Sequence, residues 1–440
     1  MSKYDITIIG AGPGGYVAAL YAAGLGKRVL VIEKDKPGGV CLNCGCIPTK
    51  TLIRSVKTLK SVKHSKEFGV DVSSHSLNYP AVRRRKDEVV KTLTKGVESL
   101  LKVKKVDVKK GFGRLVDKGV VEAAGERFES KDIIIATGTR PQELPAFKFD
   151  KTGILSSADM LDLKELPKRL LIVGGGVNGC EYAYIYASFG VEVTIVEMLD
   201  RLLPTMDREL GKNMEMILKR LNVKIMTKTR LEEIPPEYDK TVICVGRRYN
   251  TEDIGLEKVG VKTEKGRIAV DGSLRTNVPG IYAIGDVIGG YLLAHVASHE
   301  GIIACENIAG RPGVMDYGSV PLCVYTDPEI SSVGLTEGEA KDRGCEVKVA
   351  KFPFKNLGKS HTMGEKDGFI KIIGNKKTDE ILGVQMVGPQ AADLITEAAV
   401  TVKNRMKVEG VCSLMHAHPT LSEAFMEAAY LFEGRPIHAI

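Results

Sequence analysis

The sequence lacks several features that mark membrane, secreted or disulfide-rich proteins. Its longer apolar runs, such as Tyr16 to Leu25, fall short of the roughly 18 residues that a membrane-spanning helix needs. The first residues contain no basic and apolar segment of the kind that forms a secretory signal peptide. Nine cysteines among 440 residues are too sparse for a disulfide scaffold. We therefore expect a cytoplasmic protein with no membrane partner and with mostly free thiols.

Charge of one sign is not concentrated in any part of the chain either. The net charge is +8, and the composition, 43% apolar and 27% charged, is that of an ordinary globular protein. The densest basic run is Arg83-Arg84-Arg85-Lys86. It falls on a predicted helix whose apolar stripe is formed by Val82, Val89, Val90, Leu93, Val97, Leu100 and Leu101. We interpret the run as the solvated face of that helix and expect no nucleic-acid partner.

What the chain does have is a glycine-rich motif near its start. A strand-like stretch is followed by a glycine-rich turn, a helix of small residues and a second strand that ends in an acid, at residues 4–10, 10–15, 16–25 and 28–33. This is the dinucleotide-binding fingerprint in its required context. Gly10 permits the turn, Gly12 lets the backbone approach a pyrophosphate, and Gly15 lets the helix and strand pack closely. Glu33 is then placed to bind a ribose hydroxyl.

The same pattern recurs in the middle of the chain, where Gly174 to Gly179 follows an apolar strand. Glu33 lies 23 residues after Gly10, and Glu197 lies 23 residues after Gly174. Two fingerprints with acids at one offset indicate a repeated fold and hence two dinucleotides, between which a hydride can pass. An acid at this place suits a free 2′-hydroxyl and repels a 2′-phosphate. We therefore expect NAD rather than NADP at the second unit.

Three cysteines, Cys41, Cys44 and Cys46, lie just after the first fingerprint. We expect Cys41 to open a helix that continues through Val56, with Pro48 in its first turns. A thiol at a helix N-terminus has a lowered pKa, and the thiolate is the reactive form. The residues alone leave open a zinc site, a redox pair of Cys41 and Cys44, or a pair of Cys41 and Cys46. No second cysteine or histidine pair lies at zinc-finger spacing nearby, so we expect no metal.

The stretch from Gly39 to Lys50 resembles the redox-active disulfide of the flavin-dependent pyridine nucleotide-disulfide oxidoreductases. The two cysteines of that family are separated by four residues, which implies a pair of Cys41 and Cys46. The resemblance places Cys41 towards the substrate and Cys46 towards the flavin. Position 44 is usually aliphatic in the family, so we interpret Cys44 as a small apolar filler.

The resemblance also implies which residues hold the cofactors. It pairs Lys50 with Glu181 close to the flavin. The residues expected at FAD are Gly10, Gly12, Gly14, Gly15, Glu33, Lys50, Gly113, Thr137, Gly138, Asp286, Leu293, Ala294 and His295. Those expected at NAD are Gly174, Gly176, Val177, Gly179, Glu181, Glu197, Leu231 and Gly246. The connection over residues 231–240 is shorter than in relatives, and we expect it to leave nicotinamide binding intact.

Beyond residue 317 the pattern changes to strands, at residues 319–325, 347–352, 369–373 and 381–387, followed by two helices. This part resembles the dimerisation domain of the family. Its end, from His416 to Glu423, is similar to that of family members that oxidise dihydrolipoyl groups. Thr420 and Glu423 have the spacing of a capping box. The resemblance implies that Glu423 also orients His418, the base for a substrate thiol.

The predicted fold is α/β, with two Rossmann-like dinucleotide-binding domains, for FAD and NAD, and a C-terminal α+β dimerisation domain. The expected boundaries are 1–148 with 271–316 for the FAD-binding domain, 149–270 for the NAD-binding domain and 317–440 for the dimerisation domain. The implied catalytic residues are Cys41, Cys46, Lys50, Glu181, His418 and Glu423.

The function that the resemblance implies is oxidation of protein-bound dihydrolipoyl groups with reduction of NAD⁺, by a homodimer whose active sites are shared between subunits. The implied partners are the lipoyl domain of the E2 component of a 2-oxoacid dehydrogenase complex or the H protein of the glycine cleavage system. Two alternatives stay open. One is an NAD(P)H-dependent reductase of another small disulfide, and the other is a flavin- and NADH-binding sensor without turnover.

Overall fold

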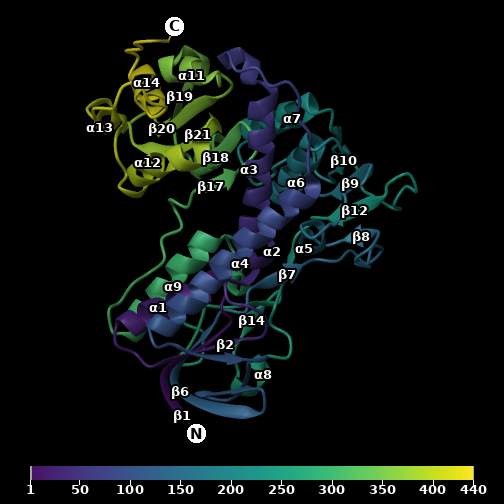
Figure 1. Cartoon of the computed structure of the whole chain (residues 1–440). Coiled ribbons are helices and arrows are strands. Elements are labelled where there is room, and N and C mark those ends of the chain that lie inside the picture. The colour runs from purple at the N-terminus through teal and green to yellow at the C-terminus, as the bar shows by residue number, and fades with distance from the viewer. Residues whose placement is uncertain (1, 440) are drawn as a thin grey trace.

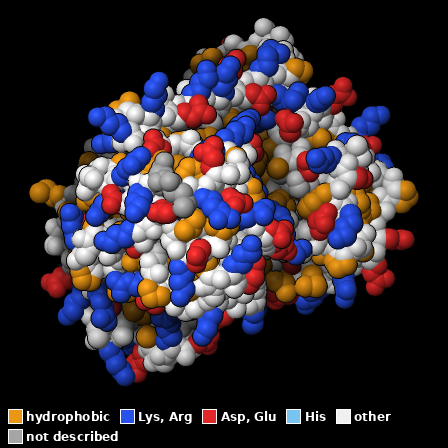
Figure 2. All heavy atoms as spheres, turned by 90° about the horizontal axis from the view of Figure 1, so that it is seen from below, with side chains coloured by type: hydrophobic (Ala, Val, Ile, Leu, Met, Phe, Trp, Pro, Cys, Tyr) orange, Lys and Arg blue, Asp and Glu red, His pale blue; other side chains and the backbone are white. Residues whose placement is uncertain are grey.

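Three bodies, each built around its own sheet, make up the chain, and the computed structural model describes residues 2–439. The first sheet lies at the bottom of Figure 1, the second at the right and the third at the upper left. The predicted α/β fold class is confirmed. None of the described helices is both long and apolar enough to cross a membrane. Acidic and basic side chains are interspersed over the face seen in Figure 2, as expected for a charge that is spread along the chain.

The first body surrounds a seven-stranded sheet. Its strands are β1 Ser2–Ile9, β2 Val29–Glu33, β3 Asp107–Lys110, β4 Arg114–Asp117, β5 Val120–Ala123, β6 Glu126–Ile135 and β16 Ile281–Ala283. They follow the order β3-β2-β1-β6-β5-β4, with β16 parallel to β6. Helix α1 (Pro13–Gly24) packs on α9 (Ala294–Ile308) through glycines, because a Cβ on Gly301 would lie only 2.7 Å from the Gly14 carbonyl oxygen. Strand β16 thus brings a late part of the chain back to the first sheet.

The return to the first body begins earlier than residue 271. Helix α8 (Leu256–Val259) and the neighbouring Ile254 pack into the core of the first body, and the backbone N–H of Leu115 donates to the Ile254 carbonyl at 2.8 Å. Hairpin β14 (Thr263–Glu264) and β15 (Arg267–Ile268) follows, with Ile268 in the same core. This packing favours a boundary near residue 250.

The second body contains five parallel strands in the order β11-β10-β9-β12-β8. Its elements are β8 Ile154–Leu155, α5 Ser157–Met160, β9 Arg169–Val173, α6 Val177–Ser188, β10 Glu192–Val196, α7 Arg208–Arg220, β11 Lys224–Met226 and β12 Lys240–Ile243. Residues 227–239 join β11 to β12 without a strand. Leu231, Ile234 and Tyr238 from this short connection cover one face of the sheet, next to Phe147.

The third body is an antiparallel sheet of five strands, ordered β17-β18-β21-β20-β19. The strands are β17 Leu322–Val324, β18 Glu329–Gly334, β19 Val347–Pro353, β20 Phe369–Asn375 and β21 Ile381–Gly388. The helices are α10 Glu337–Asp342, α11 Gly358–Met363, α12 Ala391–Lys403, α13 Val408–Cys412 and α14 Glu423–Phe432. The predicted strands are all present, but β18, α10 and α11 were not expected, and three helices rather than two follow the last strand.

Two long helices pass between the bodies, α3 (Cys46–Lys63) and α4 (Tyr79–Val103) (Figure 1). Along α3, the Lys57 ammonium pairs with Glu329 of the third body at 2.6 Å. On α4 the interpretation of the basic run is wrong at Lys86. Its ammonium is buried, donates to the Leu161 carbonyl at 2.8 Å and pairs with Asp87 at 2.8 Å. The lysine therefore docks α4 on the second body.

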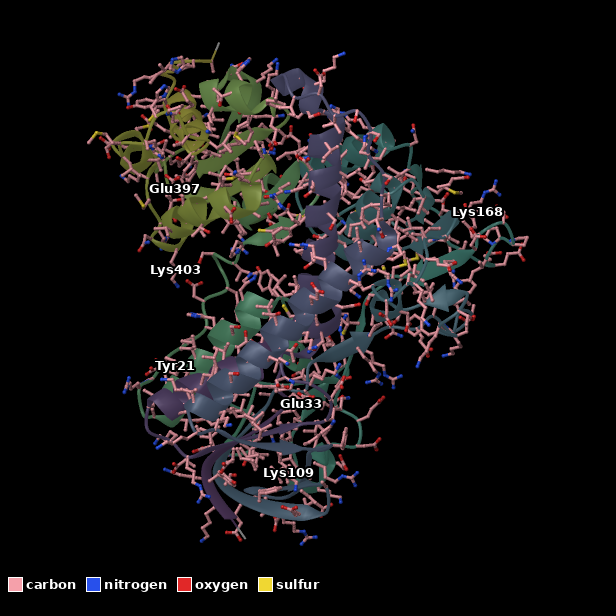
Figure 3. The ribbon with its side chains drawn as sticks, in the orientation of Figure 1. Tyr21, Glu33, Lys109, Lys168, Glu397 and Lys403 are labelled. Carbon is pink, nitrogen blue, oxygen red and sulfur yellow. The ribbon has the colours of Figure 1, made fainter. Side chains whose placement is uncertain are left out.

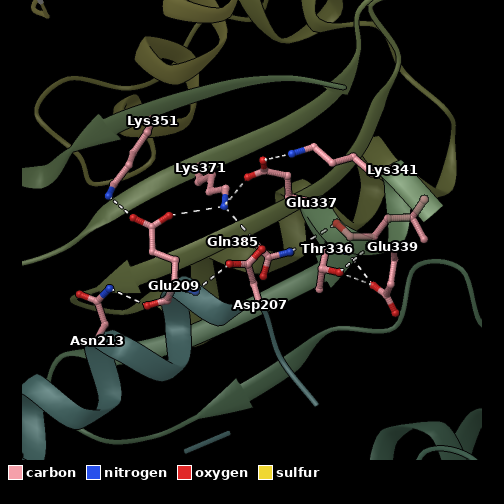
Figure 4. Close-up of polar contacts among 11 residues, drawn as sticks. Asp207, Glu209, Asn213, Thr336, Glu337, Glu339, Lys341, Lys351, Lys371 and Gln385 are labelled. Atoms are coloured by element: carbon pink, nitrogen blue, oxygen red, sulfur yellow. Dashed lines mark hydrogen bonds and ion pairs between the residues drawn. The ribbon is translucent and has the colours of Figure 1, made fainter. Parts of the chain in front are cut away.

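A buried charge network joins the second body to the third (Figure 4). The Lys371 ammonium on β20 lies 3.5 Å from Asp207, 3.4 Å from Glu209 and 3.3 Å from Glu337. Burial works to lower the pKa of Lys371, but the three carboxylates outweigh it and raise this pKa. Because Asp207 and Glu209 start α7 while Glu337 starts α10, one ammonium group holds three segments together.

We expect that Lys371→Met destabilises the protein, because it leaves three carboxylates facing one another without a cation. Removal of one partner of a buried ion pair lowers the free energy of unfolding by about 3–5 kcal/mol. Because two of the three carboxylates are partly exposed, we expect a loss at the lower end of this range, about 3 kcal/mol. Thermal and denaturant unfolding would measure the loss. Lys341→Met is the matched control, since Lys341 pairs with the same Glu337 at 2.7 Å on the surface and its loss should cost less than about 0.5 kcal/mol. Equal stability of the two variants would contradict a stabilising role for the charge network around Lys371.

Candidate active site

The first fingerprint has the geometry that its glycines predict. Gly10 has φ +105°, and a Cβ there would lie 2.4 Å from the Ala136 carbonyl oxygen. A Cβ on Gly15 would lie 1.9 Å from the Gly10 carbonyl oxygen, so helix and strand are in contact at this point. A Cβ on Gly12, at the N-cap of α1, would enter space that no atom occupies within 3.9 Å. The fingerprint therefore leaves room for a ligand at the helix N-terminus.

Glu33 ends β2, as predicted, and its place in the first body is labelled in Figure 3. One carboxylate oxygen accepts the Ala11 N–H at 2.7 Å, and the other accepts the Asp35 N–H at 2.8 Å. Each oxygen keeps a lone pair for a further donor, such as a ribose hydroxyl. Glu33 is thus fixed and can still bind a ligand.

The second fingerprint repeats these details. Gly174 has φ +111°, and a Cβ on Gly176 would meet nothing within 4 Å. The Glu197 carboxylate accepts the Gly175 N–H at 2.6 Å and the Leu199 N–H at 2.7 Å, as Glu33 does in the first body. Arg201, the nearest basic residue in sequence, instead donates to the Pro204 carbonyl at 2.7 Å. This arrangement places an acid, Glu197, where a 2′-phosphate would have to bind, and the side chain of Arg201 is engaged elsewhere.

The other residues expected at NAD lie in different settings. Val177 begins α6, and Gly179 packs on the strand, because a Cβ there would lie 2.0 Å from the Gly174 carbonyl oxygen. Gly246 has φ +134° and open space around it. Leu231 is partly buried in the small core on the sheet face. Its packing therefore has a structural reason independent of any ligand.

A cavity of about 760 Å³ connects the first fingerprint to the cysteines. Expected residues that line it are Gly10, Gly12, Gly14, Glu33, Cys41, Cys46, Lys50, Gly113, Thr137, Gly138, Glu181, Asp286 and Ala294. Gly15, Leu293 and His295 do not line it. The His295 ring lies against the Pro321 carbonyl at 3.1 Å, and burial lowers the pKa of His295. An elongated dinucleotide fits this lining, because open space at Gly12, a fixed Glu33 and a thiol pair all face one cavity.

Sequence reasoning missed Thr139 and Arg247, two polar residues of this cavity that lie beside the expected Asp286. Asp286, in the 3₁₀ helix over Gly285–Ile288, accepts the Thr139 hydroxyl at 2.6 Å. Arg247 donates to the same hydroxyl at 2.6 Å and lies 3.7 Å from Asp286. Thr139 and Arg247 begin the paired strands β7 (Thr139–Pro141) and β13 (Arg247–Tyr249). Each strand follows an apolar strand and a small-residue turn, which recur in the sequence at residues 133–138 and 241–246. The recurrence was the available signal, but the pairing of the two repeats with each other was not foreseen.

The cysteines lie on two helices rather than on the single helix that we expected. Cys41 and Cys44 belong to α2 (Gly39–Cys44), and Cys46 is the first residue of α3. The chain breaks at Gly45, where φ is −144° and ψ is −109° and a Cβ would lie 2.9 Å from the Val40 carbonyl oxygen. Cys46 is therefore the first residue of a long helix, a position that favours a thiolate, whereas Cys41 is the third residue of the short α2.

The Cys41 and Cys46 thiols affect each other's ionisation. The Cys41 thiol is hydrogen-bonded to Cys46, and this contact together with Lys50 outweighs burial and lowers the pKa of Cys46 to about 7. The same contact and burial raise the pKa of Cys41. Burial raises the pKa of Cys44 as well. Near neutral pH, Cys46 is thus the thiolate of the three.

Lys50 and Glu181 form the pair that the resemblance implied. The Lys50 ammonium lies 2.8 Å and 3.0 Å from the two Glu181 oxygens, and it stands 4.5 Å above the centre of the Tyr325 ring. Glu181, whose side chain is 1% exposed, also accepts the Tyr325 N–H at 3.0 Å. Since Lys50 is one turn after Cys46 on α3, this pair fixes a positive charge beside the thiol.

His418 and Glu423 are in contact, but they lie outside the cavity. The Nδ1 atom of His418 is 2.8 Å from Glu423, whose other oxygen accepts the Thr420 N–H at 2.8 Å. Burial opposes ionisation of Glu423, but the Thr420 N–H and His418 outweigh it and lower the pKa of Glu423. The Thr420 hydroxyl instead donates to the Ala417 carbonyl at 2.7 Å, and α14 begins only at Glu423, so the predicted capping box is half formed. The His418 side chain is 77% exposed, and neither residue lines the cavity that holds Cys41.

Comparison with known proteins extends over nearly the whole chain. A family model described as pyridine nucleotide-disulphide oxidoreductase matches residues 4–301, and one for the dimerisation domain of the same family matches residues 320–429. The chain is 44% identical to a dihydrolipoyl dehydrogenase of Bacillus subtilis (strain 168), with 99% of each chain covered. It is 41% identical to a dihydrolipoyl dehydrogenase of Chlamydia pneumoniae, with 99% of this chain and 98% of the relative covered.

Two solved structures have the same fold throughout. LpdA from Mycobacterium tuberculosis superposes with a TM-score of 0.91 at 28% identity, over 98% of this chain and 99% of the other. The HOCl-induced flavoprotein disulfide reductase RclA from Escherichia coli, in its Cu(II) complex, gives a TM-score of 0.89 at 28% identity, over 98% of this chain and all of the other. Because the two family models match the first two bodies and the third in turn, the chain belongs to the pyridine nucleotide-disulphide oxidoreductase family.

Proposed function

We propose that this chain oxidises protein-bound dihydrolipoyl groups to the cyclic disulfide and reduces NAD⁺, with FAD and NAD as its cofactors. One observation carries this proposal: Cys41 and Cys46 line the same cavity as the first dinucleotide fingerprint, together with Lys50. The relatives that match the full chain at 40–44% identity are dihydrolipoyl dehydrogenases. The dimerisation domain supports a homodimer.

The first body holds FAD. The N-terminus of α1 and Gly12 would bind the pyrophosphate of FAD, and Glu33 would bind a ribose hydroxyl. Asp286 would bind the chain that connects the pyrophosphate to the flavin ring. The second body holds NAD at the N-terminus of α6, with the ribose at Glu197. When bound, FAD would supply the two-electron redox chemistry that links the cysteines to NAD⁺.

The cysteines carry out the exchange with the substrate. His418 takes the proton of one dihydrolipoyl thiol, and the thiolate attacks the Cys41 sulfur, which breaks the Cys41–Cys46 bond and releases Cys46 as a thiolate. The second substrate thiolate then displaces Cys41, so the substrate leaves as a disulfide and its two electrons remain on the cysteines. A low pKa makes Cys46 the better leaving group, and the Lys50 ammonium stabilises its charge.

His418 of one protomer acts on Cys41 of the other. Two observations support this arrangement. The His418 ring is exposed, and His418 does not line the cavity of its own chain. The Glu423 carboxylate holds the Nδ1–H, which leaves Nε2 as the proton acceptor. The substrate carrier is the lipoyl domain of an E2 component or a glycine cleavage H protein. We place the reaction in the cytoplasm, a reducing compartment that suits the free cysteines.

We expect Cys46→Ala to keep bound FAD and to lose lipoamide turnover by at least about a hundredfold, because no thiolate can leave from the pair. Flavin absorbance and the rate of NAD⁺ reduction by dihydrolipoamide measure the two properties. Cys44→Ala is the matched control, a neighbouring half-buried thiol in the same cavity, and it should retain turnover. Retained turnover in Cys46→Ala, or its loss in Cys44→Ala, would contradict the assignment of the pair.

The choice of disulfide substrate is tested by NADH oxidation with lipoamide, with glutathione disulfide and with no disulfide in parallel. We expect lipoamide to give the fastest rate. Faster oxidation with glutathione disulfide would favour the reductase of another small disulfide. No acceleration by either, with a flavin that NADH merely bleaches, would favour the sensor, because an enzyme with a Cys46 thiolate beside the flavin should show long-wavelength absorbance on reduction.

The coenzyme preference follows from Glu197. We expect kcat/KM for NAD⁺ to exceed that for NADP⁺ by about a hundredfold or more, since the carboxylate and a 2′-phosphate would repel each other by several kcal/mol. Steady-state kinetics with each coenzyme measures the ratio. Glu197→Gln should narrow it, because the amide keeps the shape of the side chain without its charge. A ratio near one in the unmodified protein would refute this account of the second site.

A further inference from the structure

A second histidine near the end of the chain has no part in the proposed reaction. His416 lies two residues before His418, in the loop between α13 and α14, yet its side chain is only 3% exposed. Its Nε2 atom is 2.8 Å from the Glu397 carboxylate of α12, and its Nδ1 atom is 3.1 Å from the Leu414 carbonyl oxygen. Figure 3 shows Glu397 within the third body. The imidazole thus links the loop to a helix beneath it.

Both partners of this ring are hydrogen-bond acceptors. A neutral imidazole has one N–H and one unprotonated nitrogen, so it can donate to only one of them. The carbonyl of Leu414 cannot donate, and a carboxylate that is partly open to solvent, 28% in the case of Glu397, does not carry a proton at neutral pH. Both hydrogen bonds form together only when both ring nitrogens are protonated. The two contacts together therefore point to an imidazolium.

We propose that His416 is held as a buried imidazolium and is a positioning residue, which fixes the loop that presents His418 to the substrate. The ring nitrogens of the two histidines have different hydrogen-bond partners. His418 uses Nδ1 for Glu423 and leaves Nε2 free in an exposed ring, whereas His416 has both nitrogens occupied and cannot accept a proton. The inference rests on the proposed function only in assigning His418 as the base.

Two carboxylates act on His416 from the elements around it. Glu397 on α12 is in direct contact with the ring, and Glu423 on α14 is close enough for the charges of both His416 and His418 to act on it. Without its proton the His416 ring would keep only one of its two hydrogen bonds, so the loop would be held less firmly. His418 has the opposite requirement, because it must be neutral to act as a base. Oxidation of dihydrolipoamide should therefore fall at both ends of the pH range.

The kinetic test uses side chains that each keep one hydrogen bond. His416→Asn places an amide where Nδ1 was, and His416→Gln places one where Nε2 was. Each should lower kcat/KM for dihydrolipoamide by about tenfold to a hundredfold, the cost of a misplaced catalytic group. Reduction of the bound flavin by NADH should change less than about twofold, since that step does not use the loop. Variants with unchanged kcat/KM would overturn the proposal.

The charge is tested through Glu397→Gln, which leaves the imidazolium without its counter-ion. The ratio of variant to unmodified kcat/KM should fall as pH rises, and the use of a ratio removes the ionisation of the substrate thiols. Glu67→Gln is the matched control, because Glu67 pairs with His64 at 3.1 Å in an exposed histidine–glutamate pair. The ratio of kcat/KM for Glu67→Gln to that of the unmodified protein should stay constant as pH changes. A ratio for Glu397→Gln that is equally constant would contradict a charged His416.

A direct readout does not depend on activity. In the FAD-loaded dimer with ¹⁵N-labelled histidine, the His416 signals, assigned by their loss in His416→Gln, should show two protonated ring nitrogens at neutral pH. A neutral tautomer would overturn the proposal even if every variant lost activity. If the unmodified protein instead fails to oxidise dihydrolipoamide, the proposed function fails, while the nitrogen signals still decide the state of His416.

Discussion

The ion pair between Lys50 and Glu181 is the contact on which the arrangement of the active site depends. A carboxylate as deeply buried as Glu181 must find all its hydrogen bonds inside the protein, because an unpaired buried charge is very costly. Glu181 finds them at the Lys50 ammonium on α3 and at the Tyr325 N–H of the third body, while it belongs to α6 of the second body. The helix that begins at Cys46 is thereby fixed against two other parts of the molecule. The charge that stabilises the thiolate is therefore also the charge that holds the domains in place.

The features that could be predicted from the sequence are those whose cause is local. Gly10 and Gly174 adopt φ values that only glycine tolerates well, and the turn they make is a property of a few neighbouring residues. The equal spacing to Glu33 and Glu197 then predicts two copies of one fold, and both acids bind the same two backbone positions. The roles of Cys41, Cys46 and His418 came from family resemblance, since neither spacing nor composition selects among three cysteines or places a base 377 residues away from its target.

The features that the sequence did not reveal depend on groups that are distant along the chain. The break between α2 and α3 occurs at Gly45, whose backbone lies close to the Val40 carbonyl. The helical periodicity of the sequence does not reveal this contact. Lys86 looks like a surface lysine in the sequence, but its buried ammonium donates a hydrogen bond to the Leu161 carbonyl. The same holds for the short connection between β11 and β12, where Tyr238 covers the sheet and its hydroxyl donates to Thr194 at 3.0 Å. Three side chains of this short loop, Leu231, Ile234 and Tyr238, are thus enough to cover one face of the sheet.

The segment His416-Ala417-His418 shows how connectivity, rather than residue type, sets a role. Two carboxylates, Glu397 and Glu423, lie beside two imidazoles. With His416 charged and His418 neutral, the group of four has a net charge of −1, and it becomes neutral when His418 accepts a proton. In the proposed arrangement each imidazole of this segment therefore has a carboxylate of its own: Glu397 holds the buried ring of His416, and Glu423 orients the exposed ring of His418.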